Sequence, residues 1–206
     1  MKTTLLSLIL ATAFTSAAVA APVTGKGDPV LTGTVTVVNF DALGNSWVPS
    51  LTVGNLSISG IDGSISTSTT YAGSYNTRGA AYVDNAQGNT NGLRFDFANS
   101  VSAFAFNWGA SDVNWTLTAY DSTGVALEST SVNAVWGSND GDYFGLAHAG
   151  IAYAELISGG WGDYVMVDNF SFVEEAVAAV PEPGTLALFG VALAGLALGR
   201  KRKQAH

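Results

Sequence analysis

The fold is decided by residues 93–132, LRFDFANSVSAFAFNWGASDVNWTLTAYDSTGVALESTSV. Apolar residues alternate with other residues over 93–97, 104–108 and 115–119. Side chains of a β-strand point to opposite faces in turn, so this period of two predicts three strands with one face in a core. The predicted core faces are Leu93, Phe95 and Phe97; Phe104, Phe106 and Trp108; and Trp115, Leu117 and Ala119.

The end of this stretch predicts an antiparallel hairpin over residues 114–132. The strand at 115–120 is followed by Asp121-Ser122-Thr123-Gly124, four residues that favour a tight turn, and 125–132 returns as a second strand. Residues 93–113 then supply the neighbouring strands.

Further short strands are predicted on both sides of this stretch. Residues 31–40 form one. Residues 51–53 and 56–58 alternate too, but the phase slips at Gly54-Asn55, which predicts a turn or a bulge. Segments within 61–71, 80–83, 144–157 and 165–173 are rich in β-branched and aromatic residues, whereas 72–92 is polar and is predicted to be the most mobile region. About ten short strands, no amphipathic helix and no repeat predict an all-β domain, a two-sheet antiparallel sandwich of jelly-roll type over residues 21–175.

Both ends of the chain predict membrane targeting. Residues 1–20 combine Lys2, an apolar run and a small-residue cleavage site at Ala18-Val19-Ala20, which predicts a signal peptide. Residues 176–206 contain Pro181-Glu182-Pro183, an apolar run predicted to be a transmembrane helix at about 185–199, and a cationic stop-transfer cluster. That cluster is Arg200, Lys201, Arg202 and Lys203. A plain membrane anchor would explain the apolar run and the cations, but it needs no Pro-Glu-Pro.

The tail resembles the PEP-CTERM sorting signal of Gram-negative bacteria, also known as the ice-binding protein C-terminal domain. The residues that carry the resemblance are Val180 to Leu188, with Pro181-Glu182-Pro183, and the basic cluster 200–203. The resemblance implies an exosortase as partner, with cleavage near Pro-Glu-Pro. It also implies a precursor held in the inner membrane by its tail, with the domain outside the cytoplasm, and a mature form at the cell surface or outside the cell.

Charge and cysteine content exclude several functions for the exported domain. Residues 21–181 contain three basic and fifteen acidic residues, a net charge of −12, which should repel nucleic acid. The chain has no Cys, so thiol catalysis and Cys-based zinc sites are excluded.

No catalytic constellation stands out, and the domain is predicted to be non-enzymatic. A Ser-His-Asp triad would have to use His148, the one His between residues 21 and 181, and no Gly-x-Ser-x-Gly motif is present. A small glycan-active hydrolase with a carboxylate pair remains an alternative, because fifteen carboxylates are available.

Three tryptophans favour carbohydrate binding. Trp47, Trp136 and Trp161 lie in segments rich in Gly, Asn and Ser, near Asp140, Asp142 and Asp163. Exposed rings suit the C–H faces of sugars, and carboxylates accept hydrogen bonds from sugar hydroxyls. The alternative is that these rings fold back over the ends of the sandwich, as core residues.

One candidate metal site is present at the last strand. Asp168 and Asn169 could hold Ca²⁺, or could instead cap a bulge. No cofactor is otherwise expected. The sequence thus predicts a surface-sorted protein associated with exopolysaccharide or biofilm, and a matrix protein with no small ligand is the other alternative.

Overall fold

The computed structural model describes residues 22–23, 28, 31, 33–137 and 143–175. The chain divides after Glu175, and the described residues all precede that division. Their regular elements are strands, and the described part contains no helix. In chain order they are β1 (Pro22–Val23), β2 (Val35–Val38), β3 (Ser46–Val48), β4 (Ser50–Val53), β5 (Leu56–Gly60), β6 (Ile65–Ser68), β7 (Tyr82–Asp84), β8 (Gly92–Gly109), β9 (Trp115–Tyr120), β10 (Ala126–Val132), β11 (Tyr143–Ser158) and β12 (Met166–Glu174).

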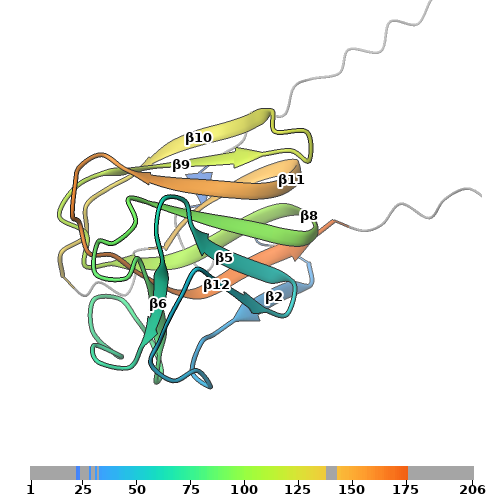
Figure 1. The fold of residues 1–206 in the computed structure, drawn as a ribbon. Helices are drawn as coiled ribbons and strands as arrows, with labels where there is room; N and C mark the ends of the chain where they lie inside the picture. The colour runs from blue at the N-terminus through green and yellow to red at the C-terminus, as the bar shows by residue number, and fades with distance from the viewer. Residues whose placement is uncertain (1–21, 24–27, 29–30, 32, 138–142, 176–206) are drawn as a thin grey trace, which may run out of the picture. The chain divides into compact units, whose positions relative to one another are not determined.

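The strands form two antiparallel layers that share two long strands (Figure 1). The first layer has the order β4-β5-β8-β11-β9-β10, using residues 92–97 of β8 and 153–158 of β11. In the second layer, residues 101–109 of β8 pair with β11 on one side and with β12 on the other. The far edge of β12 pairs with β2 and with β7, and β7 continues to β6 and β3, while β1 pairs with β11.

A bend in β8 turns this ribbon into a sandwich. The ring centroids of Phe95 and Phe106 are 5.3 Å apart, and those of Phe97 and Phe104 are 5.5 Å apart. Eleven residues of straight strand would separate Phe95 from Phe106 by roughly 36 Å. The strand therefore folds back on itself after Phe97, and its two halves face each other across the core.

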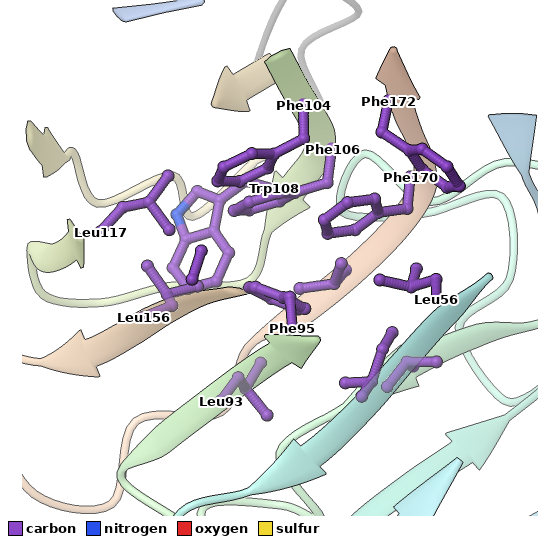
Figure 2. Close-up of a cluster of buried hydrophobic side chains, with 14 of the residues drawn as sticks. Leu56, Leu93, Phe95, Phe104, Phe106, Trp108, Leu117, Leu156, Phe170 and Phe172 are labelled. Carbon is purple, nitrogen blue, oxygen red and sulfur yellow. The ribbon is translucent and has the colours of Figure 1, made fainter. Parts of the chain in front are cut away.

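Aromatic rings from both layers fill the core (Figure 2). Phe170 lies 5.0 Å from Phe95, 5.5 Å from Phe106 and 5.7 Å from Phe104, measured between ring centroids. Burial of one such side chain contributes roughly 1.5–3 kcal/mol. The large side chains with less than 2% exposure are Trp108, Trp115, Tyr82, Phe40, Phe95, Phe104, Phe106, Phe170, Phe172, Leu56, Ile58 and Ile65.

The all-β sandwich predicted from the sequence is confirmed, and so is its hairpin. β9 and β10 pair antiparallel, with a register shift between Ala126 and Glu128, around a turn in which Asp121 N–H donates to Val125 O. The β4–β5 hairpin turns at Gly54, whose φ of +59° suits glycine. The prediction of separate short strands over 93–108 is wrong, because β8 remains hydrogen-bonded through its bend: Ala98 N–H donates to Asn55 O, and Ser100 O accepts from Glu175 N–H.

The polar segment 72–92 contributes buried polar side chains, and its mobility stays a prediction. Asn76, Asn85 and Thr90 are buried. Asn85 Nδ2 donates to the carbonyl oxygens of Thr90 and Asp163, at 3.0 and 2.6 Å. Polar side chains here form a hydrogen-bonded interior that a hydrophobic pattern cannot reveal.

The predicted signal peptide and tail helix lie outside the described residues. Within the part that the structure describes, no helix has the length and apolar character needed to cross a membrane. The domain boundaries at the two ends of the chain therefore stay predictions.

Candidate functional site

The three tryptophans singled out from the sequence are at the surface. Trp47, Trp136 and Trp161 are 58%, 66% and 94% exposed, whereas Trp108 and Trp115 are buried. The alternative of core rings is therefore wrong for these three, and their binding of sugars stays a prediction. Trp47 lies in β3 and not in a loop as its neighbours predicted.

Trp136 stands at a pocket built largely from tyrosines. This tyrosine pocket has a volume of about 260 Å³. It is lined by Tyr71, Tyr75, Ala110, Asp112, Trp136, Gly162, Tyr164 and Met166. Binding pockets for small molecules generally span about 300–1,000 Å³, so the size suits one ring of a sugar better than several. Trp161 is the chain neighbour of Gly162.

The aromatic rings of the tyrosine pocket fix one another in place. Tyr75 meets Trp136 edge to face at 6.4 Å between ring centroids, and Tyr71 meets Tyr75 at 5.8 Å. Tyr71 also meets Tyr164 edge to face at 6.5 Å. Such pairs contribute about 0.5–1.5 kcal/mol beyond their buried area, so the wall is ordered before any ligand arrives.

The backbone beneath these rings is strained. Tyr75 and Ala110 line the pocket with φ of +50° and +65°, and Asn76 has +65°. Asn76 Nδ2 donates to Trp108 O at 2.9 Å, which ties the turn to the end of β8. A Cβ on Gly109 would lie 1.7 Å from Tyr75 O, so only glycine allows this approach. Left-handed backbone at non-glycine residues costs about 1–3 kcal/mol each and clusters at functional sites.

Asp163 anchors this end of the sandwich and is not available to a sugar. Its Oδ1 accepts from Asp112 N–H at 2.9 Å, and its Oδ2 accepts from Trp115 Nε1–H at 2.7 Å. Ser111 Oγ is 3.1 Å from the same Oδ2. The expectation that Asp163 accepts from sugar hydroxyls is wrong, because the carboxylate is buried and its oxygens are engaged. Asp140 and Asp142 lie outside the described residues.

Trp47 lies at a second hollow, of different character. This Trp47 hollow has a volume of about 340 Å³. Around the single indole ring its wall consists of hydroxyl, amide and carboxylate side chains. It is lined by Asn45, Ser46, Trp47, Ser66, Thr67, Ser68, Thr70, Asp84 and Gln87, and it shares no residue with the tyrosine pocket.

A buried carboxylate links the walls of the two hollows. Asp84 Oδ1 accepts from Ser66 Oγ and from Ala86 N–H, the latter at 2.7 Å. Tyr164 Oη donates to Asp84 Oδ2 at 3.2 Å and lies 3.2 Å from Tyr82 Oη. Burial is the main cause that raises the pKa of Asp84, and burial also raises the pKa of the Tyr164 phenol.

Asp168 and Asn169 form a bulge in β12, the alternative role considered for them. Asp168 Oδ2 accepts from Arg78 N–H and Oδ1 from Asn169 N–H, both at 2.6 Å. Asn169 has a φ of +44°, and its Nδ2 donates to Asn107 Oδ1 at 3.1 Å. Burial raises the pKa of Asp168 to about 6. Among the described residues no three His, Cys, Asp or Glu side chains gather as metal ligands, so Ca²⁺ binding here stays a prediction.

Neither hollow contains a catalytic pair among the described residues. The tyrosine pocket has the carboxylate of Asp112, and the Trp47 hollow has that of Asp84. His148 lines neither, and its Nδ1 is 2.6 Å from Ala149 O. Glycoside hydrolysis generally needs two carboxylates facing one sugar, so the hydrolase alternative has no pair in either described hollow.

Comparison with known proteins identifies the C-terminal tail. The model of the PEP-CTERM protein-sorting motif matches residues 179–203. The chain carries a PEP-CTERM sorting motif. This confirms the resemblance noted on Pro181-Glu182-Pro183 and the basic cluster 200–203. The motif implies an exported protein held at the membrane until an exosortase processes it.

The remaining comparisons concern the whole chain and its sandwich. No curated protein matches its sequence. TmCBM61 in complex with β-1,4-galactotriose is 16% identical over 58% of this chain and 88% of its own, with a TM-score of 0.34. A single-residue mutant of CBM29-2, a family 29 carbohydrate-binding module, is 13% identical over 73% of this chain and 99% of its own, with a TM-score of 0.37.

A third similar structure is the xylan-binding module CBM86 from Roseburia intestinalis. It is 15% identical over 69% of this chain and 97% of its own, with a TM-score of 0.32. At these identities and TM-scores the likeness carries no argument about the site of this chain.

The sequence indicated the tryptophans but missed the tyrosines. Tyr71 and Tyr75 lie within or beside the polar segment 72–92, and Tyr164 precedes β12. None of them follows an alternating pattern, and the segments that carry them are about 90 residues apart. The one signal in the sequence was their type, because aromatic rings beside polar segments are candidates for a binding surface.

Proposed function

We propose that the exported domain is a non-enzymatic carbohydrate-binding domain that holds the protein in exopolysaccharide at the cell surface or in a biofilm. The tyrosine pocket is the binding site. The observation that carries the proposal is Trp136, which is 66% exposed above a pocket lined by three tyrosines.

The chemistry of the pocket suits a sugar ring. The faces of Trp136 and Tyr71 offer apolar surface to the C–H groups of a pyranose, and Asp112 at the rim accepts hydrogen bonds from its hydroxyls. Rings that already hold one another lose little freedom on binding. The contact area is small, so affinity is weak for one chain and depends on repetition along a polymer.

The sorting tail supports the same role. Export past the membrane puts the domain where the cell's polysaccharides are, and processing by an exosortase removes the membrane attachment. Binding to polysaccharide is then what retains the released protein. This proposal joins the tail and the pocket in one function.

The test is retention on exopolysaccharide. Protein purified from its producing cells is run by affinity electrophoresis through gels that contain the cells' own polysaccharide. Trp136→Ala should lose at least tenfold in retention, with an unchanged melting temperature. The matched control is Val125→Ala, an equally exposed apolar side chain at the β9–β10 turn that lines neither hollow.

Two outcomes would contradict the proposal. Equal mobility of all proteins with and without polysaccharide would favour a matrix protein with no small ligand. New reducing ends in the polysaccharide would show a hydrolase, and the non-enzymatic assignment would be wrong.

A further inference from the structure

The Trp47 hollow has a wall that suits a polyhydroxylated ligand. Apart from the indole, its lining consists of hydroxyl, amide and carboxylate side chains. A small apolar ligand would leave these groups without partners, which is costly, whereas sugar hydroxyls can both donate to them and accept from them. The ring of Trp47, 58% exposed, supplies the one flat apolar surface.

Several of these polar groups have no partner within the described part of the protein. Asn45 Oδ1 accepts from Thr69 N–H and Thr69 Oγ1 at 2.8 and 3.1 Å, which fixes the side chain. No hydrogen bond among the described residues uses the amide nitrogen of Asn45 or the side chain of Gln87. The amide donor of Asn45, held by these two bonds, can meet a ligand without rearrangement.

The backbone at this hollow is strained in the same way as at the tyrosine pocket. Ala86 and Gln87 have φ of +51° and +58°. The carboxylate of Asp84 accepts from Ala86 N–H and holds this turn, so Gln87 is presented at the hollow at a conformational cost. Six described non-glycine residues have a positive φ. All of them except Asn169 line one of the two hollows or are chain neighbours of a lining residue.

The two hollows are neighbours and share a wall. Thr70 lines the Trp47 hollow, and the next residue, Tyr71, lines the tyrosine pocket. Between them Asp84, 1% exposed, is hydrogen-bonded to Tyr164, whose ring belongs to the pocket. Because this hydrogen-bonded pair of buried Asp84 and half-buried Tyr164 lies between the two linings, we expect the hollows to receive separate segments.

We propose that the Trp47 hollow is a second saccharide site, which takes a neutral sugar, and that the domain cross-links two polysaccharide segments. The cross-linking rests on the proposed function of the tyrosine pocket, whereas binding at Trp47 does not. The preference for neutral sugar follows from charge: Asp84 lines the hollow, and the net charge of −12 over residues 21–181 repels uronate chains.

The experiment counts sites and measures cross-linking on the purified protein. Isothermal titration with neutral tetrasaccharides of glucose, galactose and mannose gives the stoichiometry. Turbidity with the corresponding neutral polysaccharides reports cross-links. The variants are Trp47→Ala, Trp136→Ala and the double variant. Asn45→Ala removes one amide and leaves the ring of Trp47, and circular dichroism verifies the fold of each.

The expected result is two sites in the unmodified protein, one in each single tryptophan variant and none in the double variant. Turbidity should disappear in each single tryptophan variant, and Asn45→Ala should weaken the second site at least threefold. A tetramer of galacturonic acid should bind at least tenfold more weakly than the neutral probes.

Three results would overturn the inference. If Trp47→Ala keeps two sites and full turbidity, the Trp47 hollow binds no sugar, and the proposed function of the tyrosine pocket still stands. A single site that either variant abolishes would show one continuous groove. The absence of any titration by these probes refutes the neutral-sugar site. A fourth result would bear on the proposed function instead. If Trp47→Ala loses binding and Trp136→Ala binds as the unmodified protein does, the tyrosine pocket is not the site. The Trp47 hollow then remains a saccharide site without cross-linking.

Discussion

Replacement of Asp163 by Asn should lower the unfolding free energy by about 2–3 kcal/mol. The amide oxygen can still accept from Asp112 N–H, and the amide nitrogen can donate to Ser111 Oγ. The indole of Trp115 is a donor only, so the amide nitrogen would face it without a bond. A hydrogen bond to a charged group contributes roughly 1.5–3 kcal/mol, and here it is lost at a buried site.

A double-mutant cycle isolates this one bond. Trp115→Phe removes the indole N–H together with part of the ring, and its own cost includes a cavity. In that background Asp163→Asn should cost less than about 1 kcal/mol, which gives a coupling of roughly 1–3 kcal/mol. Urea unfolding is followed by circular dichroism, because Trp115 contributes to the fluorescence. A coupling below about 0.5 kcal/mol would refute the view that the Asp163 carboxylate holds Trp115.

Three other predictions concern the core, the pH dependence and the tail. Phe106→Ala should cost about 3–5 kcal/mol in urea unfolding, because the ring is fully buried, whereas Val37→Ala at an exposed position should change it by less than about 0.5 kcal/mol. The pKa of Asp168 is raised from 3.8 to about 6 by burial, so its contribution favours folding below pH 4 and is lost as the pH rises to 6. This group alone should lower the unfolding free energy by about 2 kcal/mol between pH 4 and 6, and Asp168→Asn should remove that part of the slope, whereas Asp84, whose pKa burial also raises, keeps its own part; a slope unchanged by Asp168→Asn would contradict the prediction. Changing Pro181 and Pro183 to Ala should leave export intact and retain a membrane-bound precursor, seen by fractionation and immunoblotting, and normal release would count against exosortase processing.

The alternating pattern predicted the strands well and their continuity badly. Phe95 and Phe106 differ by an odd number of residues, and a straight strand would put them on opposite faces. The sequence therefore favoured two strands. The bend depends on pairing with β5, β11 and β12, which are distant in sequence, so no local pattern could show it.

The exposed tryptophan of the candidate site could be predicted from the sequence, but the tyrosine pocket beside it could not, because it too depends on contacts between distant segments. Exposure of Trp136 follows from its polar surroundings, which a sequence displays directly. The tyrosine pocket needs contact between Tyr71 and Tyr164, which are far apart in the sequence. Tyr164 directly precedes β12, so this contact depends on the pairing of β12 in the sheet. Asp163 was misjudged because a carboxylate in a Gly-rich loop gives no sign of the buried indole that it accepts from.

The position of β12 has a consequence for the order of events during export. β12 lies between β8 on one side and β2 and β7 on the other, yet it is the last strand before the sorting tail. The second layer therefore has no centre until residues 166–174 have left the membrane, and its aromatic rings stay uncovered until then. Pairings between such distant segments close slowly, in milliseconds to seconds. Cleavage near Pro-Glu-Pro sooner than this would release an unfinished chain with those rings exposed. With the processing that the sorting motif implies, productive release requires a step slower than the docking of β12.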